Sequence, residues 1–186
     1  MSSRDLVAEE RHVLAVLSSE RFLRMEGLGN EVPFFIWAYP PQQELEVQEA
    51  TGRILSVLRS EHGLNVLAVD LFDLSITLLE ERGRSVLDRL ETVEPTRSRS
   101  DFRRDLQRML DPEKHIVPAI KQQIDVEADL DILVLTGVGR VFPFIRSHNI
   151  LNNLQRAASR IPVLTLFPGE YRQAAGSGSS LVLFDR

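Results

Sequence analysis

Short apolar runs alternate with helical patterns along most of this chain. The runs are rich in aliphatic, β-branched or aromatic residues and predict strands at residues 33–39, 64–72, 131–136, 161–167 and 181–184. Between them, apolar side chains recur three and four residues apart, as in amphipathic helices. This alternation predicts an α/β fold with three layers, α/β/α, around a mostly parallel sheet of four to five strands.

The helical patterns cover residues 3–24, 44–62, 74–81, 85–93, 101–110, 112–124 and 147–159. We expect Ser3, Asp73, Ser85 and Ser147 as N-caps, because their side chains can accept from free backbone amides at a helix start. Pro118 should kink or split its helix. The pattern thus predicts an N-terminal helix within residues 1–30 and a helical insertion over residues 84–128, between strands two and three. Residues 94–100 and the glycine- and serine-rich residues 169–180 are expected to be loops.

The composition narrows the class of protein. A chain of 186 residues with 43% hydrophobic residues can build a core, and its length favours one α/β domain over residues 1–186. It has no cysteine, which excludes disulfides, thiolate metal sites and a cysteine nucleophile. It also lacks an apolar stretch of the roughly 20 residues that cross a membrane, and a signal-peptide core. We therefore expect a cytoplasmic protein without a membrane partner.

The charge pattern argues against a broad nucleic-acid surface. The formal net charge is −5, and proteins that follow the phosphate backbone usually carry a basic face. The only lysines in the sequence of this chain are Lys114 and Lys121, so nearly all of its basic residues are arginines. Arginine suits bidentate recognition of carboxylate or phosphate, but codon usage in a GC-rich genome explains the bias more simply.

The turn after the third strand is the first place to look for a ligand, because α/β sheets bind ligands beyond the carboxyl ends of their strands. Gly137 and Gly139 give a GxG spacing there, but neither the lysine of a P-loop nor the third glycine of a dinucleotide fingerprint follows. We interpret the glycines as a turn that needs positive φ. Asp70 ends an apolar run, as the magnesium-holding aspartate of an NTPase does. Without a phosphate loop, we interpret Asp70 or Asp73 as a helix cap instead.

Catalytic and metal motifs are absent from the sequence. The four histidines are scattered singly, without the spacing that would aim two ligands at one ion, and GxSxG does not occur. Ser147 and His148 are adjacent, so their side chains diverge on a helix. We expect neither a metal nor a cofactor, and a phosphoesterase or NTPase centred on Asp70 and His148 is the least favoured hypothesis.

Polar residues gather where the chain enters the helix after this turn. Arg146, Ser147, His148 and Asn149 could present cations and amides to an anion at a helix N-terminus. The alternative is structural, with Asn149, Asn152 and Asn153 pairing loop backbone groups. A nucleotide- or nucleic-acid-binding module using Arg140, Arg146 and His148 therefore stays open. Residues 142–144, FPF, are either a core plug, the favoured interpretation, or an exposed knob for a partner.

These residues also carry a family resemblance. Residues 136–154, TGVGRVFPFIRSHNILNNL, followed by residues 162–171, PVLTLFPGEY, resemble the BrxB family of BREX phage-defence systems, a DUF1788-type family. The matching positions are Gly137, Gly139, Pro143, Arg146, His148, Leu151, Asn152, Asn153, Pro168, Gly169 and Tyr171. The length and element order extend the resemblance to essentially the whole chain. Relatives are expected to continue past residue 186 with an aromatic tail, so this chain would be either a truncated form or one that has lost that tail.

The resemblance implies a non-catalytic core component of a bacterial defence system. Such systems contain a methyltransferase, a large ATPase and an alkaline-phosphatase-like PglZ protein, and BrxB-like proteins resemble adaptors that bind these larger components. The PglZ-like protein is the partner we expect first, with other BREX components, and any association with DNA would be indirect. The candidate ligand- or partner-binding residues are Arg140, Arg146, His148, Asn149, Asn152, Asn153 and Tyr171. The residues expected to shape turns are Gly137, Gly139, Pro143, Pro168 and Gly169.

Overall fold

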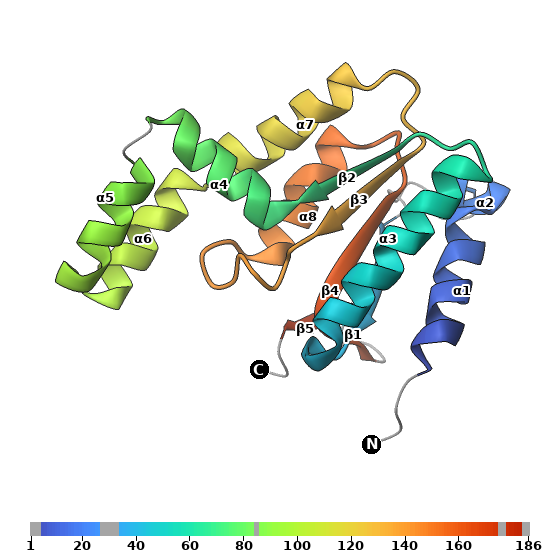
Figure 1. Cartoon of the computed structure of the whole chain (residues 1–186), viewed down its shortest axis with the longest axis horizontal. Helices are drawn as coiled ribbons and strands as arrows, with labels where there is room; N and C mark the ends of the chain where they lie inside the picture. Colours follow the sequence, from blue (N-terminus) through green and yellow to red (C-terminus); the bar gives the residue numbers. More distant parts are fainter. Residues whose placement is uncertain (1–4, 27–33, 84–85, 175–177, 184–186) are drawn as a thin grey trace. The chain divides into compact units, whose positions relative to one another are not determined.

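The computed structural model describes residues 5–26, 34–83, 86–174 and 178–183. The chain divides into two compact units (Figure 1). Unit 1 comprises residues 1–68, 128–136 and 160–186, and unit 2 comprises residues 69–127 and 137–159. Strand β2 (Val66–Asp70) crosses from unit 1 into unit 2. The expectation of a single domain over residues 1–186 stays a prediction.

Unit 1 is built on a parallel sheet. The strand order is β1 (Phe34–Tyr39), β4 (Val163–Ala174), β3 (Ile132–Thr136), β2. β4 is flanked by β1 and β3, with Phe34 opposite Val163 on one side and Leu133 opposite Val163 on the other. The predicted α/β fold with a mostly parallel sheet is therefore confirmed, and β5 (Gly178–Leu183) adds an antiparallel fifth strand to β4.

Strands β4 and β5 correct the prediction of a loop over residues 169–180 for residues 169–174 and 178–180, and the residues between them lie outside the described part of the chain. β4 continues to Ala174, and its second half pairs with β5, so that Gly169 lies opposite Leu183 and Ala174 opposite Gly178. Glycine and serine suggested a loop by composition. The second half of β4 is a strand because β5, which contains the apolar residues 181–183, gives it a backbone partner.

The N-terminal pattern gives two helices where one was predicted. α1 (Leu6–Leu17) is capped by Asp5, which accepts from the amides of Val7 and Ala8. It ends at two serines, since the hydroxyl of Ser18 donates to a backbone carbonyl of the preceding turn at 2.8 Å and Ser19 caps α2 (Glu20–Leu23). Serine side chains compete in this way with helical hydrogen bonds. The predicted cap Ser3 lies outside the described residues.

Helices α1 and α3 cover one face of this sheet (Figure 1). α3 (Glu44–Ser60) follows the 3-10 turn η1 (Pro41–Gln43), and both helices pack their apolar side chains onto the strands. The buried residues of this core are Val13, Leu17, Trp37, Tyr39, Val47, Ala50, Ile54, Leu58, Val66, Ile132, Val134, Leu164 and Leu166. The alternate strand residues Leu133, Leu135, Val163, Thr165 and Phe167 are buried as well. Burial on both faces is what the central layer of an α/β/α fold requires.

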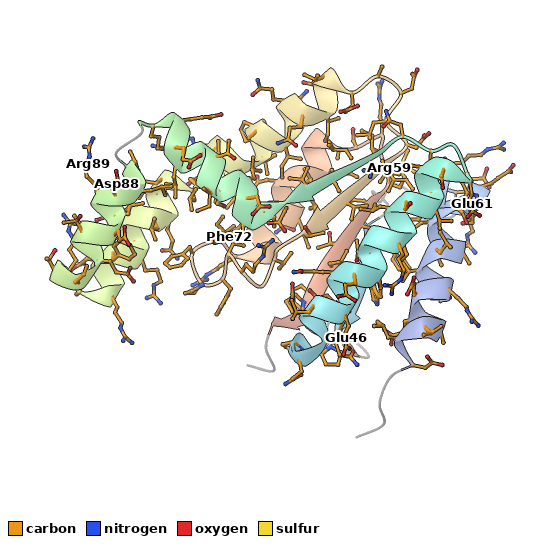
Figure 2. The ribbon with its side chains drawn as sticks, in the orientation of Figure 1. Glu46, Arg59, Glu61, Phe72, Asp88 and Arg89 are labelled. Carbon is orange, nitrogen blue, oxygen red and sulfur yellow. The ribbon has the colours of Figure 1, made fainter. Side chains whose placement is uncertain are left out.

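Side-chain pairs join α3 to its neighbours. Arg59 (labelled in Figure 2) donates to the carbonyl of Val66 at 2.8 Å, which ties the end of α3 to the start of β2. Arg53 binds both carboxylate oxygens of Glu10 on α1, at 2.9 and 2.8 Å. This hydrogen bond lowers the pKa of the Glu10 carboxyl, against the opposing effect of its partial burial.

Unit 1 should lose the stabilisation that the Glu10–Arg53 pair provides when the pH becomes acidic. Because the pKa of Glu10 is lower when folded, its contribution is present above the unfolded pKa of about 4.5 and is lost as the pH falls below it. We expect Arg53→Met to lower Tm at pH 7 and to have a smaller effect at pH 3. Thermal melting at pH 7 and at pH 3 in low salt measures the two changes in Tm. The double variant Glu10→Gln/Arg53→Met is the control. An equal loss of Tm at both pH values would contradict the assignment.

Unit 2 is helical. Its elements are α4 (Leu71–Glu81), α5 (Val86–Val93), the 3-10 turn η2 (Glu94–Thr96), α6 (Arg99–Met109), the π-helical turn η3 (Pro112–Ile116), α7 (Val117–Val126) and α8 (Ser147–Ala157). α8 contacts both η3 and α7, and η3 also contacts α4. The buried apolar side chains include Leu74, Leu79, Leu106, Leu110, Ile116, Ile120, Ile124, Val138, Val141, Ile145, Ile150 and Leu154. α5 contributes none of the buried residues.

Several predicted boundaries change in unit 2. Asp70, not Asp73, caps α4, and Ser98 caps α6, which shortens the predicted loop at residues 94–100. The pattern at residues 112–124 splits as expected, with η3 running into α7 and Pro118 in the first turn of α7. Proline is tolerated there because the amides of a first turn need no helical acceptor. Ser85 lies outside the described residues.

Candidate functional site

The carboxylate of Asp70 is the centre of the strand-end site. Asp70 is the last residue of β2, and its Oδ1 accepts from the amides of Phe72 and Asp73 at 2.9 and 3.1 Å. Capping begins α4 one turn earlier than the predicted cap at Asp73 would allow. Asp73 itself lies in the first turn of α4, where a carboxylate is favourable near the helix N-terminus.

Gly137 lies directly against this carboxylate. Its φ is +73°, and a Cβ placed on it would be 2.7 Å from Oδ1 and 2.9 Å from Oδ2 of Asp70. Only glycine combines the left-handed conformation with this close approach. The predicted positive φ is therefore confirmed at Gly137. Gly139 is not among the described glycines with positive φ.

Arg140, in the same turn as Gly137, also contacts the Asp70 carboxylate. Its guanidinium forms an ion pair with Oδ2 of Asp70, lies 3.8 Å from Oδ1 of Asp73 and stacks 5.1 Å from the centre of the Phe72 ring. We call Asp70, Phe72, Asp73, Gly137 and Arg140 the Asp70 cluster. The Arg140 side chain remains 40% exposed, but two carboxylates balance its charge. The cluster thus links the start of α4 to the 137–146 turn within unit 2.

Two aromatic side chains are exposed beside or within this cluster. Phe72 (labelled in Figure 2) is 38% exposed, and Phe142, in the same turn as Arg140, is 47% exposed. The favoured interpretation of residues 142–144 as a core plug is therefore wrong for Phe142. Phe144 is half-buried and, with Phe72 and Val141, lines an apolar cavity of about 130 Å³ whose other walls come from α4 and α6. The tip of the turn is apolar and open to solvent, and its base packs on the helices.

Arg146 lies in a different setting from Arg140. It holds the cap position of α8 without a capping side-chain hydrogen bond, so Ser147 is the first helical residue and not the predicted cap. Arg146 and Asn149 line a hollow of about 280 Å³ together with Gln107, Asp111, Pro112 and Phe144. The side chains of Ser147 and His148 lie outside the described set, so a joint site of Arg140, Arg146 and His148 stays a prediction.

The remaining predicted site residues have local roles or are untested. Asn153 donates to the carbonyl of Asn149 at 2.8 Å within α8, and the side chain of Asn152 is exposed. The carbonyl of Pro143 accepts from Gln107 at 3.3 Å. In the sheet, Pro168 pairs with Tyr39, Gly169 with Leu183 and Tyr171 with Leu181. The side chain of Tyr171 is not among those described, so its role in binding stays a prediction.

The polar groups of the Asp70 cluster are bound mainly to one another. Both oxygens of Asp70 already hold partners, and among the described residues no group of three histidine, cysteine or acidic side chains could hold a metal ion. No helix in the described ranges is long and apolar enough to cross a membrane. Sequence reasoning missed Phe72, although an aromatic residue two positions after a strand-end aspartate was the available signal.

The family model and the relatives that match this chain carry the same description. A family model described as "BREX protein BrxB" matches residues 67–186. A BREX protein BrxB from Bacillus cereus (strain H3081.97) is 35% identical over 176 residues, which cover 92% of this chain and 86% of that relative. Another from Escherichia coli O9:H4 (strain HS) is 33% identical over 155 residues, which cover 83% of this chain and 74% of that relative. The residues matched by the family model include the whole Asp70 cluster.

Proposed function

The chain belongs to the BrxB family of BREX phage-defence systems, and from this premise we propose that it is a non-catalytic adaptor subunit whose first partner is the PglZ-like protein. An adaptor needs an exposed surface that a larger protein can bury. The exposed aromatic residues at the Asp70 cluster are the observation that carries the proposal.

Phe72, Arg140 and Phe142 have the properties of an interface hot spot. Aromatic residues and arginine dominate the binding energy of protein interfaces, and arginine stacked on an aromatic ring is already ordered before it binds. The ion pairs of Arg140 and the packing of Phe72 hold this surface in place, which reduces the entropy lost when a partner binds. We propose that Phe142 is its apolar anchor.

The contacts of Asp70 and Arg140 weigh against nucleotide or nucleic-acid binding and against a hydrolytic enzyme. A phosphate would have to compete with Asp70 and Asp73 for Arg140, which disfavours nucleotide or nucleic-acid binding there. An NTPase or phosphoesterase would need the Asp70 carboxylate for a metal, but this carboxylate caps α4 and pairs with Arg140. These contacts support a binding role over a catalytic one.

Co-expression with the neighbouring BREX proteins tests the proposal. We expect this chain to co-elute in gel filtration with the PglZ-like protein and to show no hydrolytic turnover alone. Phe142→Ala should weaken that complex by at least tenfold, since truncating an interface anchor costs about 1–2 kcal/mol or more. Leu45→Ala is the matched control, because Leu45 is also an exposed apolar side chain, at 74%, but lies on α3 in unit 1.

The outcomes separate the alternatives. Failure to co-elute with any BREX protein would refute the adaptor role. Equal weakening by Phe142→Ala and Leu45→Ala would remove the Asp70 cluster as the interface. Salt-sensitive binding of DNA or nucleotide that is lost in Arg146→Ala/His148→Ala would favour the nucleotide- or nucleic-acid-binding function instead.

A further inference from the structure

A second surface, separate from the Asp70 cluster, lies between α5 and α6. The two helices are joined by η2 and lie side by side (Figure 1). A groove of about 400 Å³ lies between them. The residues that line it are Val86, Arg89, Leu90, Val93, Arg97, Asp105, Arg108 and Met109. We call it the α5–α6 groove.

The floor of this groove is apolar and only half-buried. Val86, Leu90 and Val93 lie on one face of α5, at the i, i+4, i+7 spacing of an amphipathic helix, and Met109 faces them from α6. None of these side chains is fully buried in the described structure. A helix of two turns with an apolar face normally buries that face. Because the apolar face of α5 is only half-buried, a further apolar element can still cover it.

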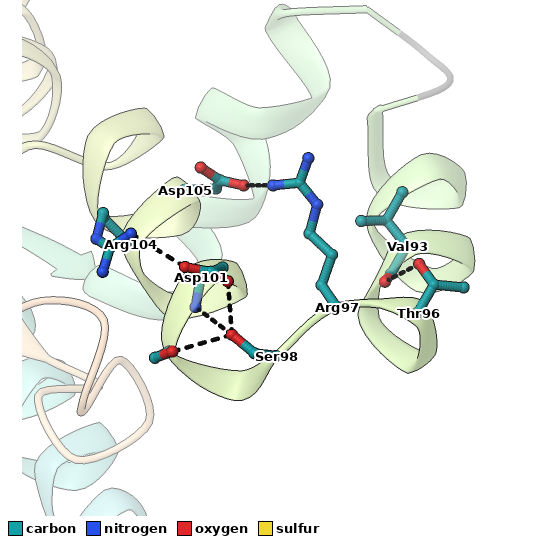
Figure 3. Close-up of polar contacts among 8 residues, drawn as sticks. Val93, Thr96, Arg97, Ser98, Asp101, Arg104 and Asp105 are labelled. Atoms are coloured by element: carbon teal, nitrogen blue, oxygen red, sulfur yellow. Dashed lines mark hydrogen bonds and ion pairs between the residues drawn. The ribbon is translucent and has the colours of Figure 1, made fainter.

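The rim of the groove is positively charged. Arg89 (labelled in Figure 2), Arg97 and Arg108 line it against the single carboxylate of Asp105, so its lining residues carry a net charge of +2. Asp105 on α6 forms an ion pair with Arg97 of the connection that precedes α6 (Figure 3). The rim thus differs in sign from the whole chain, whose net charge is −5.

The connection between the helices fixes the groove before anything binds. The Thr96 hydroxyl donates to the carbonyl of Val93 at 2.8 Å, and Ser98 caps α6 while donating to Asp101 at 2.7 Å (Figure 3). A preformed groove loses little conformational entropy on binding.

We propose that the α5–α6 groove binds an acidic amphipathic helix of a partner protein. Its apolar side chains would fill the floor above Leu90 and Met109, and its carboxylates would pair with Arg89 and Arg108 at the rim. The apolar floor favours a protein segment over nucleic acid, because a phosphate backbone offers charge but nothing to cover the floor. The inference deepens the proposed adaptor function by giving a second partner-binding surface and its chemistry.

The test uses two helical probe peptides and the full chain. One peptide carries leucine at i, i+3, i+4 and i+7 with glutamate elsewhere, and its twin replaces every glutamate by lysine. Fluorescence anisotropy should show salt-sensitive binding of the acidic peptide and at least tenfold weaker binding of the twin. Arg89→Glu/Arg108→Glu should weaken the acidic peptide at least tenfold and bind the lysine twin more tightly than the parent chain does.

Arg99→Glu/Arg103→Glu is the matched control. It makes the same change of charge at two exposed positions of α6 that do not line the groove, and it should leave peptide binding within twofold. Thermal melting checks that each variant folds, and Arg108→Glu alone replaces the double variant if that one does not. The inference is overturned if both peptides bind equally or if Arg99→Glu/Arg103→Glu weakens binding as much as Arg89→Glu/Arg108→Glu does. It is also overturned if a 20-nucleotide DNA binds the parent chain but not the groove variant, while the acidic peptide does not bind.

The complex with the PglZ-like protein separates this inference from the function on which it rests. If that complex forms and Arg89→Glu/Arg108→Glu weakens it tenfold more than the control does, the groove is part of the interface. If the complex forms but neither peptide nor complex responds to the groove variant, the groove inference fails and the adaptor function stands. If no BREX protein co-elutes, the adaptor function fails, whatever the peptides do.

Discussion

Replacing Gly137 by alanine is expected to lower the free energy of unfolding by about 3 kcal/mol, because two separate penalties add. An L-residue at φ +73° costs about 1–2 kcal/mol. The new methyl group would also lie within 3 Å of both oxygens of Asp70, which are held by α4 and Arg140 and cannot move without loss of a hydrogen bond. Urea unfolding followed by circular dichroism measures the change.

Gly52→Ala is the matched control for this substitution. Gly52 lies inside α3 with no atom within 4 Å of its missing Cβ. Alanine there should raise the free energy of unfolding by about 0.5–1 kcal/mol, since glycine is a poor helix former. In an Asp70→Ala background the cost of Gly137→Ala should fall to the backbone penalty alone. An unchanged cost in that background would show that the carboxylate is not the obstacle.

Asp70→Ala is expected to lower the free energy of unfolding by about 2 kcal/mol, because it removes the cap of α4 and the partner of Arg140 together. Asp70→Asn should lose less than Asp70→Ala, since asparagine is an equally good cap but does not balance the charge of Arg140. Urea unfolding of the parent chain, Asp70→Ala and Asp70→Asn measures the contribution of the helix cap and that of the charge opposite Arg140.

Asp73→Ala distinguishes the observed cap from the predicted one. The Asp73 side chain is 74% exposed and lies 3.8 Å from Arg140, so its removal should change the free energy of unfolding by less than about 0.5 kcal/mol. If Asp73→Ala costs as much as Asp70→Ala, then α4 starts where the sequence pattern placed it.

The sheet could be predicted because its inner strands are buried on both faces, which leaves unbroken apolar runs such as residues 132–135. The pairing of β4 with β5 could not, because residues 176–180 are all glycine or serine, a composition typical of loops. The start of α4 was misplaced for a similar reason. Asp70 and Asp73 are chemically the same, and local periodicity does not decide which one ends the strand.

The candidate site was predicted only in part. Gly137 was expected to need positive φ, and local chemistry was enough for that. The partner of Arg140 is 70 residues away in sequence, so only the fold brings it to Asp70. Phe142 looked like a core residue because it is aromatic and lies beside an apolar stretch, yet the turn leaves it 47% exposed. Hydrophobicity predicts burial on average but does not identify the exposed aromatic residues.

The carboxylate of Asp70 also has an evolutionary consequence. It meets the α4 amides, the bare Cα of Gly137 and the guanidinium of Arg140 at once, so no one of these positions can change without altering what the others tolerate. A lineage that loses the aspartate relaxes the demand for glycine at 137 and leaves the cation at 140 beside the more distant carboxylate of Asp73. A larger residue at 137, in turn, is accessible only after the aspartate has been replaced. The order in which substitutions arise, and not only their identity, therefore decides which sequences this turn can reach.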